Sequence, residues 1–347
     1  MDKIRVLIVD DSALARKVCR DVLCDDPIFD VVGEACDALD ARDKIKALNP
    51  HVLTLDVQMP GMNGLTFLEK LMQLRPMPVV MVSSLTEEGA METIQALELG
   101  AVDYIPKPST SFSVDAFAHE LRRKVRVAST AQVRPLPKTP QTIQRLQVLH
   151  KPDASKIIGI GSSTGGVEAL TVILSQLPAE TPPILICQHM PPRFTASFAA
   201  RLNQRTAIRV FEAQDQMVVL PNHAYIAPGG YHMYLEKRSK NFVICLKDNT
   251  HMNLNNCPSV DVLFNSMAHV VGSTTVAFVL TGMGNDGAQG MKALHEKGAM
   301  TFGQNEASCV VYGMPRAAKE MGAIMEELAL NHVASKIMSV SGKRGDA

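Results

Sequence analysis

The 347-residue sequence has no net charge and no long apolar run, and each absence excludes a class of protein. Lys and Arg together number 35, as do Asp and Glu, which argues against a protein that binds nucleic acid through bulk charge. No apolar run reaches the roughly 18 residues that a membrane-spanning helix needs. The first residues hold one short run, IRVLIV, that ends in two acids, so we expect neither a signal peptide nor membrane insertion.

The sequence also lacks paired cysteines. Its seven cysteines are odd in number, and none forms a CxxC motif. A disulfide framework uses cysteines in pairs and a zinc knuckle uses a CxxC motif, so we expect neither, and we expect a reducing cytoplasmic location. With 46% hydrophobic and 20% charged residues the composition is that of a soluble globular protein. A chain of this length predicts two domains.

Residues 1–127 alternate short apolar runs with patterns of helical spacing. Such a βα repeat predicts a five-stranded, parallel, doubly wound sheet of flavodoxin-like type, with helices on both faces. The apolar runs are 4–9, 29–35, 51–55, 78–84 and 101–105.

Residues 128–155 break this alternation. The segment holds four prolines and little periodicity, which predicts a linker with a short helix near 142–149. The alternation resumes at residue 156, so we expect a second α/β domain over 156–347. Its sheet should be mainly parallel, with antiparallel hairpins added by residues 207–246.

Polar side chains follow four strands of the first predicted sheet. Asp10 and Asp11 follow the first strand, Asp56 the third, Ser83 the fourth and Lys107 the fifth. The carboxyl ends of parallel strands are where open α/β sheets bind ligands. Carboxylates about 4 Å apart repel by about 4 kcal/mol per pair at an effective dielectric constant of 20, a penalty that Mg²⁺ would remove. The set suits an aspartyl phosphate on Asp56, although a solvated set of acids at strand ends is the alternative.

The motifs around these residues, IVDDS, LDVQMPGMNG and DYIPKP, resemble those of the response-regulator receiver domain over about residues 1–125. The resemblance implies phosphorylation of Asp56 by a partner histidine kinase, in a two-component signalling system. It also implies a Mg²⁺ ion and three switch residues. The implied metal ligands are Asp10, Asp11, Asp56 and the backbone carbonyl of Gln58, and the switch residues are Ser83, Tyr104 and Lys107.

The second predicted domain begins with KIIGIGSSTGGVEAL, a strand, a glycine-rich turn and a helix. A dinucleotide-binding fingerprint needs G-x-G-x-x-G, and Thr164 occupies the third glycine position. The segment 161–165 instead fits G-x-S-x-G, the tight turn that exposes a nucleophilic serine, here Ser163. A phosphate-binding or purely structural glycine turn stays open as an alternative.

Two further residues support the nucleophile. His189 follows the second strand of this domain, and Asp286 follows a later one among three glycines. A serine needs a base, usually His, to act as a nucleophile at neutral pH. That base in turn needs a carboxylate that orients it. Three strand-end residues of one parallel sheet can converge on a single crevice. The glycines could turn backbone N–H groups toward a ligand, or they could form a tight surface turn.

The chain order Ser, His, Asp differs from the Ser, Asp, His order of α/β-hydrolases. The motifs GIGSSTGG, QHMPPRFTASFA, APGGYHM, PSVDVLF and LTGMGNDGAQG instead resemble the catalytic domain of chemotaxis protein-glutamate methylesterases, the CheB family, over about residues 156–340. The resemblance implies that Ser163 is the nucleophile, His189 the general acid and base, and Asp286 the orienting carboxylate. It implies that the backbone N–H of Met283 stabilises the oxyanion.

Together the two resemblances imply a phosphorylation-activated hydrolase. It would demethylate glutamate methyl esters, and deamidate glutamines, on chemoreceptors, with no cofactor for the esterase chemistry. Three other classes of protein are alternatives. The size and neutrality of the second domain disfavour a transcription factor, and the failed glycine spacing disfavours a nucleotide-dependent oxidoreductase. A non-catalytic scaffold would be distinguished from a hydrolase by comparing the methanol release of Ser163→Ala with that of the parent protein.

Overall fold

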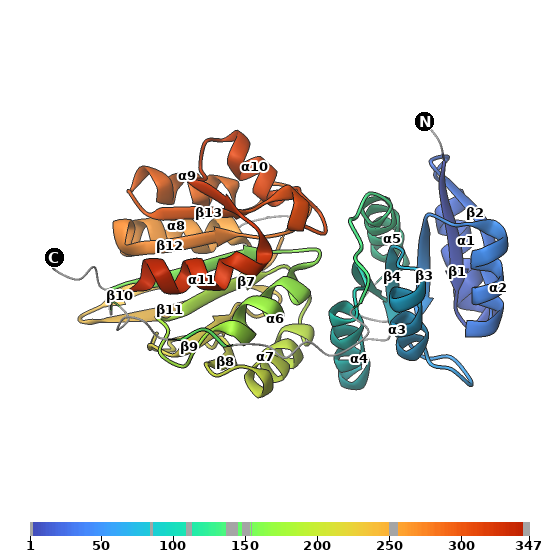
Figure 1. Ribbon diagram of the computed structural model, residues 1–347, viewed down its shortest axis with the longest axis horizontal. Helices are drawn as coiled ribbons and strands as arrows, with labels where there is room; N and C mark the ends of the chain where they lie inside the picture. The colour runs from blue at the N-terminus through green and yellow to red at the C-terminus, as the bar shows by residue number, and fades with distance from the viewer. Residues whose placement is uncertain are drawn as a thin grey trace. The chain divides into compact units, whose positions relative to one another are not determined.

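The chain folds into two compact units, Met1–Gln141 and Thr142–Ala347, in the computed structural model (Figure 1). The structure describes residues 3–83, 86–108, 113–136, 145–147, 153, 155–249 and 256–342. Within these ranges no helix has both the length and the apolar character needed to cross a bilayer. The expected limits, with domains over 1–127 and 156–347 and a linker over 128–155, stay a prediction.

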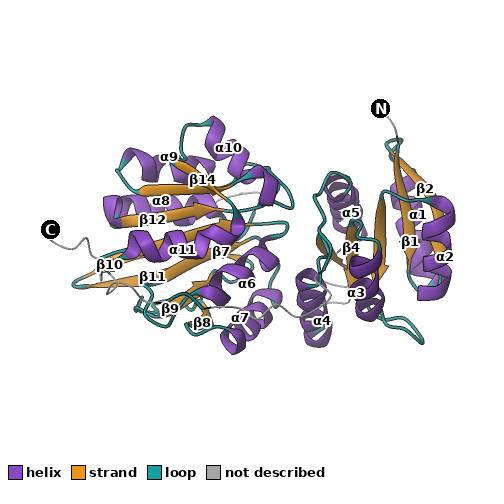
Figure 2. Ribbon diagram, in the orientation of Figure 1, coloured by secondary structure: helices purple, strands orange, loops and turns teal. Residues whose placement is uncertain are grey.

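The first unit is the expected five-stranded parallel sheet, with strand order β2-β1-β3-β4-β5. Figure 2 draws its strands in orange and its helices in purple. Its strands are β1 (Ile4–Val9), β2 (Phe29–Ala35), β3 (Val52–Asp56), β4 (Val79–Ser83) and β5 (Asp103–Pro106). Its helices are α1 (Ala13–Cys24), α2 (Ala38–Leu48), α3 (Gly64–Leu74), α4 (Glu87–Glu98) and α5 (Val114–Ala128).

Local sequence signals set the ends of these helices. The hydroxyl of Ser12 accepts the N–H of Ala15 at the start of α1, and the carboxylate of Asp37 accepts two N–H groups at the start of α2. Such side chains satisfy donors that have no partner within the helix. Helices α1 and α2 thus begin shortly after β1 and β2 end, which leaves the polar residues between them at one edge of the sheet.

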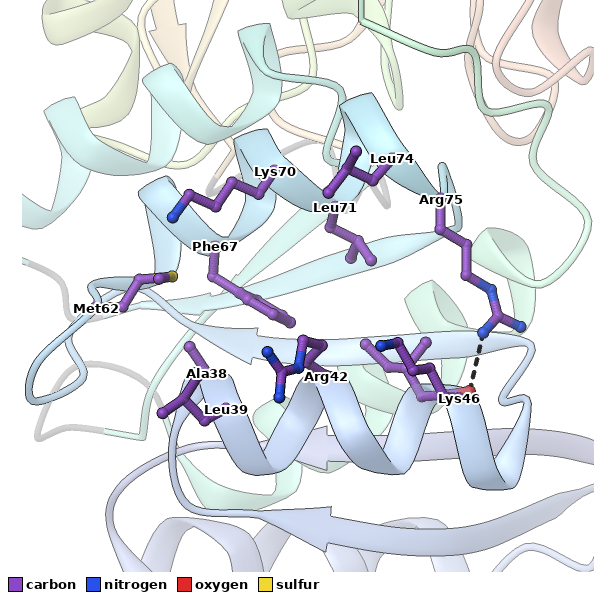
Figure 3. A pocket seen from close by; sticks show the side chains of 11 residues that line it. Ala38, Leu39, Arg42, Lys46, Met62, Phe67, Lys70, Leu71, Leu74 and Arg75 are labelled. Atoms are coloured by element: carbon purple, nitrogen blue, oxygen red, sulfur yellow. Dashed lines mark hydrogen bonds between the residues drawn. The ribbon is translucent and has the colours of Figure 1, made fainter.

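A groove of about 350 Å³ lies between α2 and α3 (Figure 3). Apolar side chains such as Phe67 line it, and cationic side chains such as Lys70 lie along it. Arg75 donates to the carbonyl of Ile45 over 3.1 Å and so joins the end of α3 to α2. None of the residues expected to perform chemistry lines this groove.

The second unit contains a seven-stranded sheet with order β14-β13-β12-β6-β7-β9-β8, all parallel, and a separate antiparallel hairpin. The sheet strands are β6 (Ile157–Ser162), β7 (Ile184–Gln188), β8 (Arg209–Glu212), β9 (His223–Ile226), β12 (Thr275–Val279), β13 (Met300–Gln304) and β14 (Glu326–Leu328). The hairpin is β10 (Tyr231–Arg238) and β11 (Asn241–Asp248). The helices are α6 (Gly166–Gln176), α7 (Phe194–Arg205), α8 (Val260–Val270), α9 (Ala288–Glu296), α10 (Met314–Glu320) and α11 (Leu330–Ser341).

Helices cover both faces of this sheet (Figure 1). Every second residue of the central strands, such as Leu185 and Cys187 in β7, belongs to one buried cluster with α8 and α9. The intervening residues point to the other face, where α6 and α11 contact each other. The hairpin packs on α8, where the hydroxyl of Ser266 accepts the N–H of Leu235 over 3.0 Å.

The expectation of antiparallel hairpins over residues 207–246 is only partly right. The hairpin of β10 and β11 confirms it, but β8 and β9 are parallel strands of the main sheet. Ten residues separate β8 from β9, near the lower limit for a connection between parallel strands and many more than the two that a hairpin turn needs. Of the helix expected near 142–149 only residues 145–147 are described, and these three are not helical.

Candidate functional sites

Three carboxylates meet at the carboxyl edge of the first sheet. Asp10 directly follows β1, Asp56 ends β3, and each offers an oxygen that lies within 4.8 Å of the others and of one from Asp11. Asp10 and Asp56 are buried, and Asp11 is exposed. Strands β1 and β3 are neighbours in the sheet, which explains why residues so far apart in sequence converge here.

Lys107 contacts two of these carboxylates. Its Nζ lies 2.9 Å from Oδ2 of Asp10 and 2.7 Å from Oδ2 of Asp56. Burial raises the pKa of Asp56, as does the nearby charge of Asp10, and the hydrogen bond from Lys107 only partly offsets this. Three carboxylates around one ammonium leave two negative charges uncompensated. That donor set, all oxygen and partly exposed, fits a divalent cation such as Mg²⁺.

The remaining predicted residues of this unit lie around the carboxylates. Gln58 donates its backbone N–H to the carboxylate of Asp56. Ser83 ends the neighbouring strand β4, and its buried hydroxyl donates to the carbonyl of Gly89 in α4 over 3.3 Å. Tyr104 lies in β5 with its ring buried, and burial raises the pKa of its hydroxyl well above the ordinary value. The Ser83 hydroxyl therefore joins the carboxyl edge of the sheet, where the three carboxylates lie, to α4.

The second unit brings Ser163 and His189 to neighbouring strand ends. Ser163 follows β6, and its N–H donates to the carbonyl of Thr281 over 3.0 Å. His189 follows β7, and its N–H donates to the carbonyl of Ser162 over 3.0 Å. Because β6 and β7 pair in parallel, both residues emerge at the same edge of the sheet.

The imidazole of His189 contacts Asp286. Its Nε2 lies 2.7 Å from Oδ2 of Asp286, and the two side chains are only 13% and 11% exposed. Since Nε2 hydrogen-bonds to the carboxylate, Nδ1 is the ring nitrogen that can accept a proton from a nucleophile. Among the described residues no hydrogen bond joins the Ser163 hydroxyl to this ring, a contact that catalytic groups often complete only when substrate is bound.

Asp286 is held at the N-terminus of α8. Its Oδ1 accepts the hydroxyl of Ser259 over 2.8 Å and the N–H of Asp261 over 3.0 Å, and its Oδ2 accepts the N–H of Val260 over 2.8 Å. Burial alone would raise the pKa of Asp286, but the hydrogen bond and charge of His189, with these N–H donors, lower it to about 2. The carboxylate is therefore ionised and fixed in orientation at neutral pH.

A glycine-containing loop closes over Ser163. A Cβ on Gly282 would lie 2.8 Å from the Cβ of Ser163 and 2.3 Å from Sδ of Met314, so only glycine fits there. Gly284 has a φ of 90°, in the left-handed region that favours glycine. Met283 lies between these two glycines, in the loop that abuts the serine.

Sequence reasoning missed several residues that support this site. Ser259 holds Asp286, Gln188 precedes His189, and Gln304 accepts the N–H of Thr281 over 2.8 Å. The two glutamines are buried at the carboxyl ends of β7 and β13. A polar residue that ends an otherwise apolar strand was the available signal, in ILICQ and MTFGQ.

Known proteins with similar sequences cover nearly the whole chain. The chain matches the family model for CheB methylesterase over residues 158–337 and that for the response regulator receiver domain over residues 6–116. It is 50% identical to the protein-glutamate methylesterase/protein-glutamine glutaminase of Pectobacterium atrosepticum, over 98% of this chain and 97% of that protein. The identity and coverage are the same for the protein of that name in Escherichia coli O157:H7.

A solved structure supports the same assignment. The crystal structure of the Thermotoga maritima CheB methylesterase catalytic domain is similar with a TM-score of 0.52 and 36% sequence identity, over 53% of this chain and 98% of that chain. The chain belongs to the CheB methylesterase family, with a response regulator receiver domain in its N-terminal part.

Proposed function

We propose that the chain is a cytoplasmic, phosphorylation-activated serine hydrolase that demethylates glutamate methyl esters and deamidates glutamines on chemoreceptors. The names of the relatives support this substrate class. The observation that carries the proposal is the 2.7 Å contact between His189 and Asp286 beside the turn that bears Ser163. A base oriented by an ionised carboxylate next to a serine suits acyl transfer.

The chemistry uses Ser163 as a nucleophile. Its Oγ forms a bond to the ester carbonyl carbon while its proton passes to Nδ1 of His189. The carbonyl oxygen gains negative charge, which the N–H of Met283 stabilises. When the bond to the methoxy oxygen breaks, His189 returns the proton and methanol leaves; with a glutamine substrate the leaving group is ammonia.

Water then completes the turnover. A water molecule loses a proton to His189 and attacks the acyl carbon, and the bond to Ser163 Oγ breaks as that oxygen regains the proton. The product is a glutamate side chain. Throughout both steps Asp286 stays ionised and stabilises the protonated imidazole, a role that its lowered pKa supports.

The receiver domain would control this reaction through Asp56. A chemotaxis histidine kinase would donate a phosphoryl group to its carboxylate oxygen, with Lys107 and Ser83 contacting the phosphoryl oxygens. Mg²⁺, held by Asp10, Asp11, Asp56 and the carbonyl of Gln58, would neutralise part of the charge on that group. Ser83 and Tyr104 would transmit the change, which the Ser83 contact with α4 supports.

The test is methanol release from membranes that contain methylated chemoreceptors. Ser163→Ala should lower the rate at least about a thousandfold, the usual scale for loss of a catalytic nucleophile. Ser335→Ala, which changes an exposed serine on α11, is the matched control and should keep the parent rate. A Ser163→Ala rate within tenfold of the parent would refute the proposal and favour a scaffold.

A further inference from the structure

Gln188 directly precedes His189, and its side-chain amide is buried. It is the last residue of β7 and only 3% exposed. In the register of the sheet it pairs with Ser162, the last residue of β6. Its side chain therefore lies between the turn that carries Ser163 and the loop that carries His189.

The carboxamide of Gln188 hydrogen-bonds to both segments. Its Oε1 accepts the hydroxyl of Ser162 over 2.6 Å. Its Nε2 donates to the carbonyl of Ser163 over 2.9 Å and to the carbonyl of His189 over 3.1 Å. The opposite orientation of the amide would place its oxygen against two carbonyl oxygens, so the two carbonyls fix which way it points.

The nucleophile turn is shaped around this amide. The carbonyl of Ser163 also accepts the N–H of Gly166 over 2.8 Å, which closes the turn at the start of α6. A Cβ on Gly166 would lie 2.0 Å from Oε1 of Gln188. The amide can occupy its position only because residue 166 is glycine.

We propose that Gln188 is a positioning residue that fixes the backbones of Ser163 and His189 relative to each other. The proposal rests on the function proposed above. One amide group holds the carbonyls of both residues, so it determines how the hydroxyl approaches the imidazole. Displacing reacting groups by about 1 Å can cost about a hundredfold in rate, which sets the scale of the expected effect.

Gln188→Met tests the role in the full-length protein. Methionine keeps the length of the side chain and removes all three hydrogen bonds. We expect kcat for methanol release to fall about 10- to 100-fold with KM within twofold, because the change affects the reacting groups and not receptor binding. The rate at which a small fluorophosphonate labels Ser163 should fall by a similar factor. Gln204→Met, an exposed glutamine in α7, should change neither rate.

Two outcomes separate positioning from stability alone. A Gln188→Met protein that melts at a lower temperature yet keeps the parent kcat and labelling rate, both measured well below that temperature, would overturn the proposal. If Gln188→Met does not fold, Ser162→Ala removes only the bond that anchors Oε1. It should slow labelling several-fold, and an unchanged labelling rate in Ser162→Ala would equally overturn the proposal.

Ser163→Ala separates this proposal from the proposed function. If Ser163→Ala retains hydrolysis and labelling, the proposed nucleophile is wrong whatever Gln188 does. If Ser163→Ala abolishes both while Gln188→Met and Ser162→Ala change neither, only the role of Gln188 is wrong.

Discussion

His189 Nε2 lies 2.7 Å from Oδ2 of Asp286, although 97 positions separate the two residues in the chain. The sheet explains the meeting, because β12 and β7 lie on either side of β6. Asp286 follows β12, Ser163 follows β6 and His189 follows β7. Each of three adjacent strands is therefore followed by one residue of the site. The parallel order of these strands is thus what assembles the site.

Asp286→Asn should lower kcat for methanol release by about a thousandfold or more, as loss of an orienting carboxylate does in other serine hydrolases. The amide would no longer hold the imidazole with Nε2–H toward residue 286 and would not stabilise its protonated form. Asp215→Asn, which changes an exposed carboxylate, is the control. Circular dichroism should show that both variants are folded, and a rate within tenfold of the parent would argue against the role of Asp286.

The same carboxylate should stabilise the fold in a defined pH window. The pKa of Asp286 is lowered from 3.8 to about 2, so its contribution is fully present above pH 4 and is lost as the pH falls through about 2. A shift of this size corresponds to about 2 kcal/mol of unfolding free energy. Denaturant titrations should show the difference between parent and Asp286→Asn shrinking from pH 4 to pH 2. A constant difference over that range would contradict the assignment.

Gly282→Ala should impair the site although it adds only a methyl group. The new Cβ would lie 2.3 Å from Sδ of Met314 and 2.8 Å from the Cβ of Ser163, so the loop must move away from the nucleophile. We expect methanol release to fall at least about tenfold. Gly284→Asn is a useful comparison because its position is open and asparagine tolerates a positive φ. Equal activity of parent and Gly282→Ala would show that the loop is not required to lie this close.

Mg²⁺ should stabilise the first unit through the acidic cluster. A cation that binds only the folded protein raises the unfolding temperature, and Asp10, Asp11 and Asp56 lose their mutual repulsion when it binds. Calorimetry should show a rise with millimolar MgCl₂ in the parent and a smaller rise in Asp56→Asn. NaCl at the same ionic strength controls for screening. Equal shifts in parent and variant would argue against a metal at this site.

The two-domain arrangement predicts that the unphosphorylated receiver domain inhibits the catalytic part. A fragment that begins near residue 150 should therefore release methanol faster than the unphosphorylated full chain. Phosphorylation of Asp56 should raise the rate of the full chain toward that of the fragment, and Asp56→Asn should abolish this rise. A fragment no faster than the unphosphorylated chain would contradict the inhibition.

Much of the fold could be predicted because apolar strands and amphipathic helices alternate. The expected strands at 4–9 and 29–35 coincide with β1 and β2. The direction of β8 and β9 could not be predicted, because a four-residue strand has the same residue pattern whichever way it runs. The three-residue strand β14 was too short to leave a pattern.

The supporting contacts of the site were harder to predict than its named residues. Ser163 and His189 stand at strand ends within recognisable motifs. The partners of Gln188 depend on which way its amide points, and Ser162 lies 26 positions away in the chain. The N-terminus of α8 meets Asp286 only through the packing of α8 on α9, which no local pattern encodes.

The most direct test of the central claim is the position of the covalent adduct formed with a fluorophosphonate. Peptide mass spectrometry should locate the adduct on Ser163, and labelling should be lost in Ser163→Ala and strongly slowed in His189→Ala. An adduct on another residue, or undiminished labelling in Ser163→Ala, would contradict the assignment of Ser163 as the nucleophile.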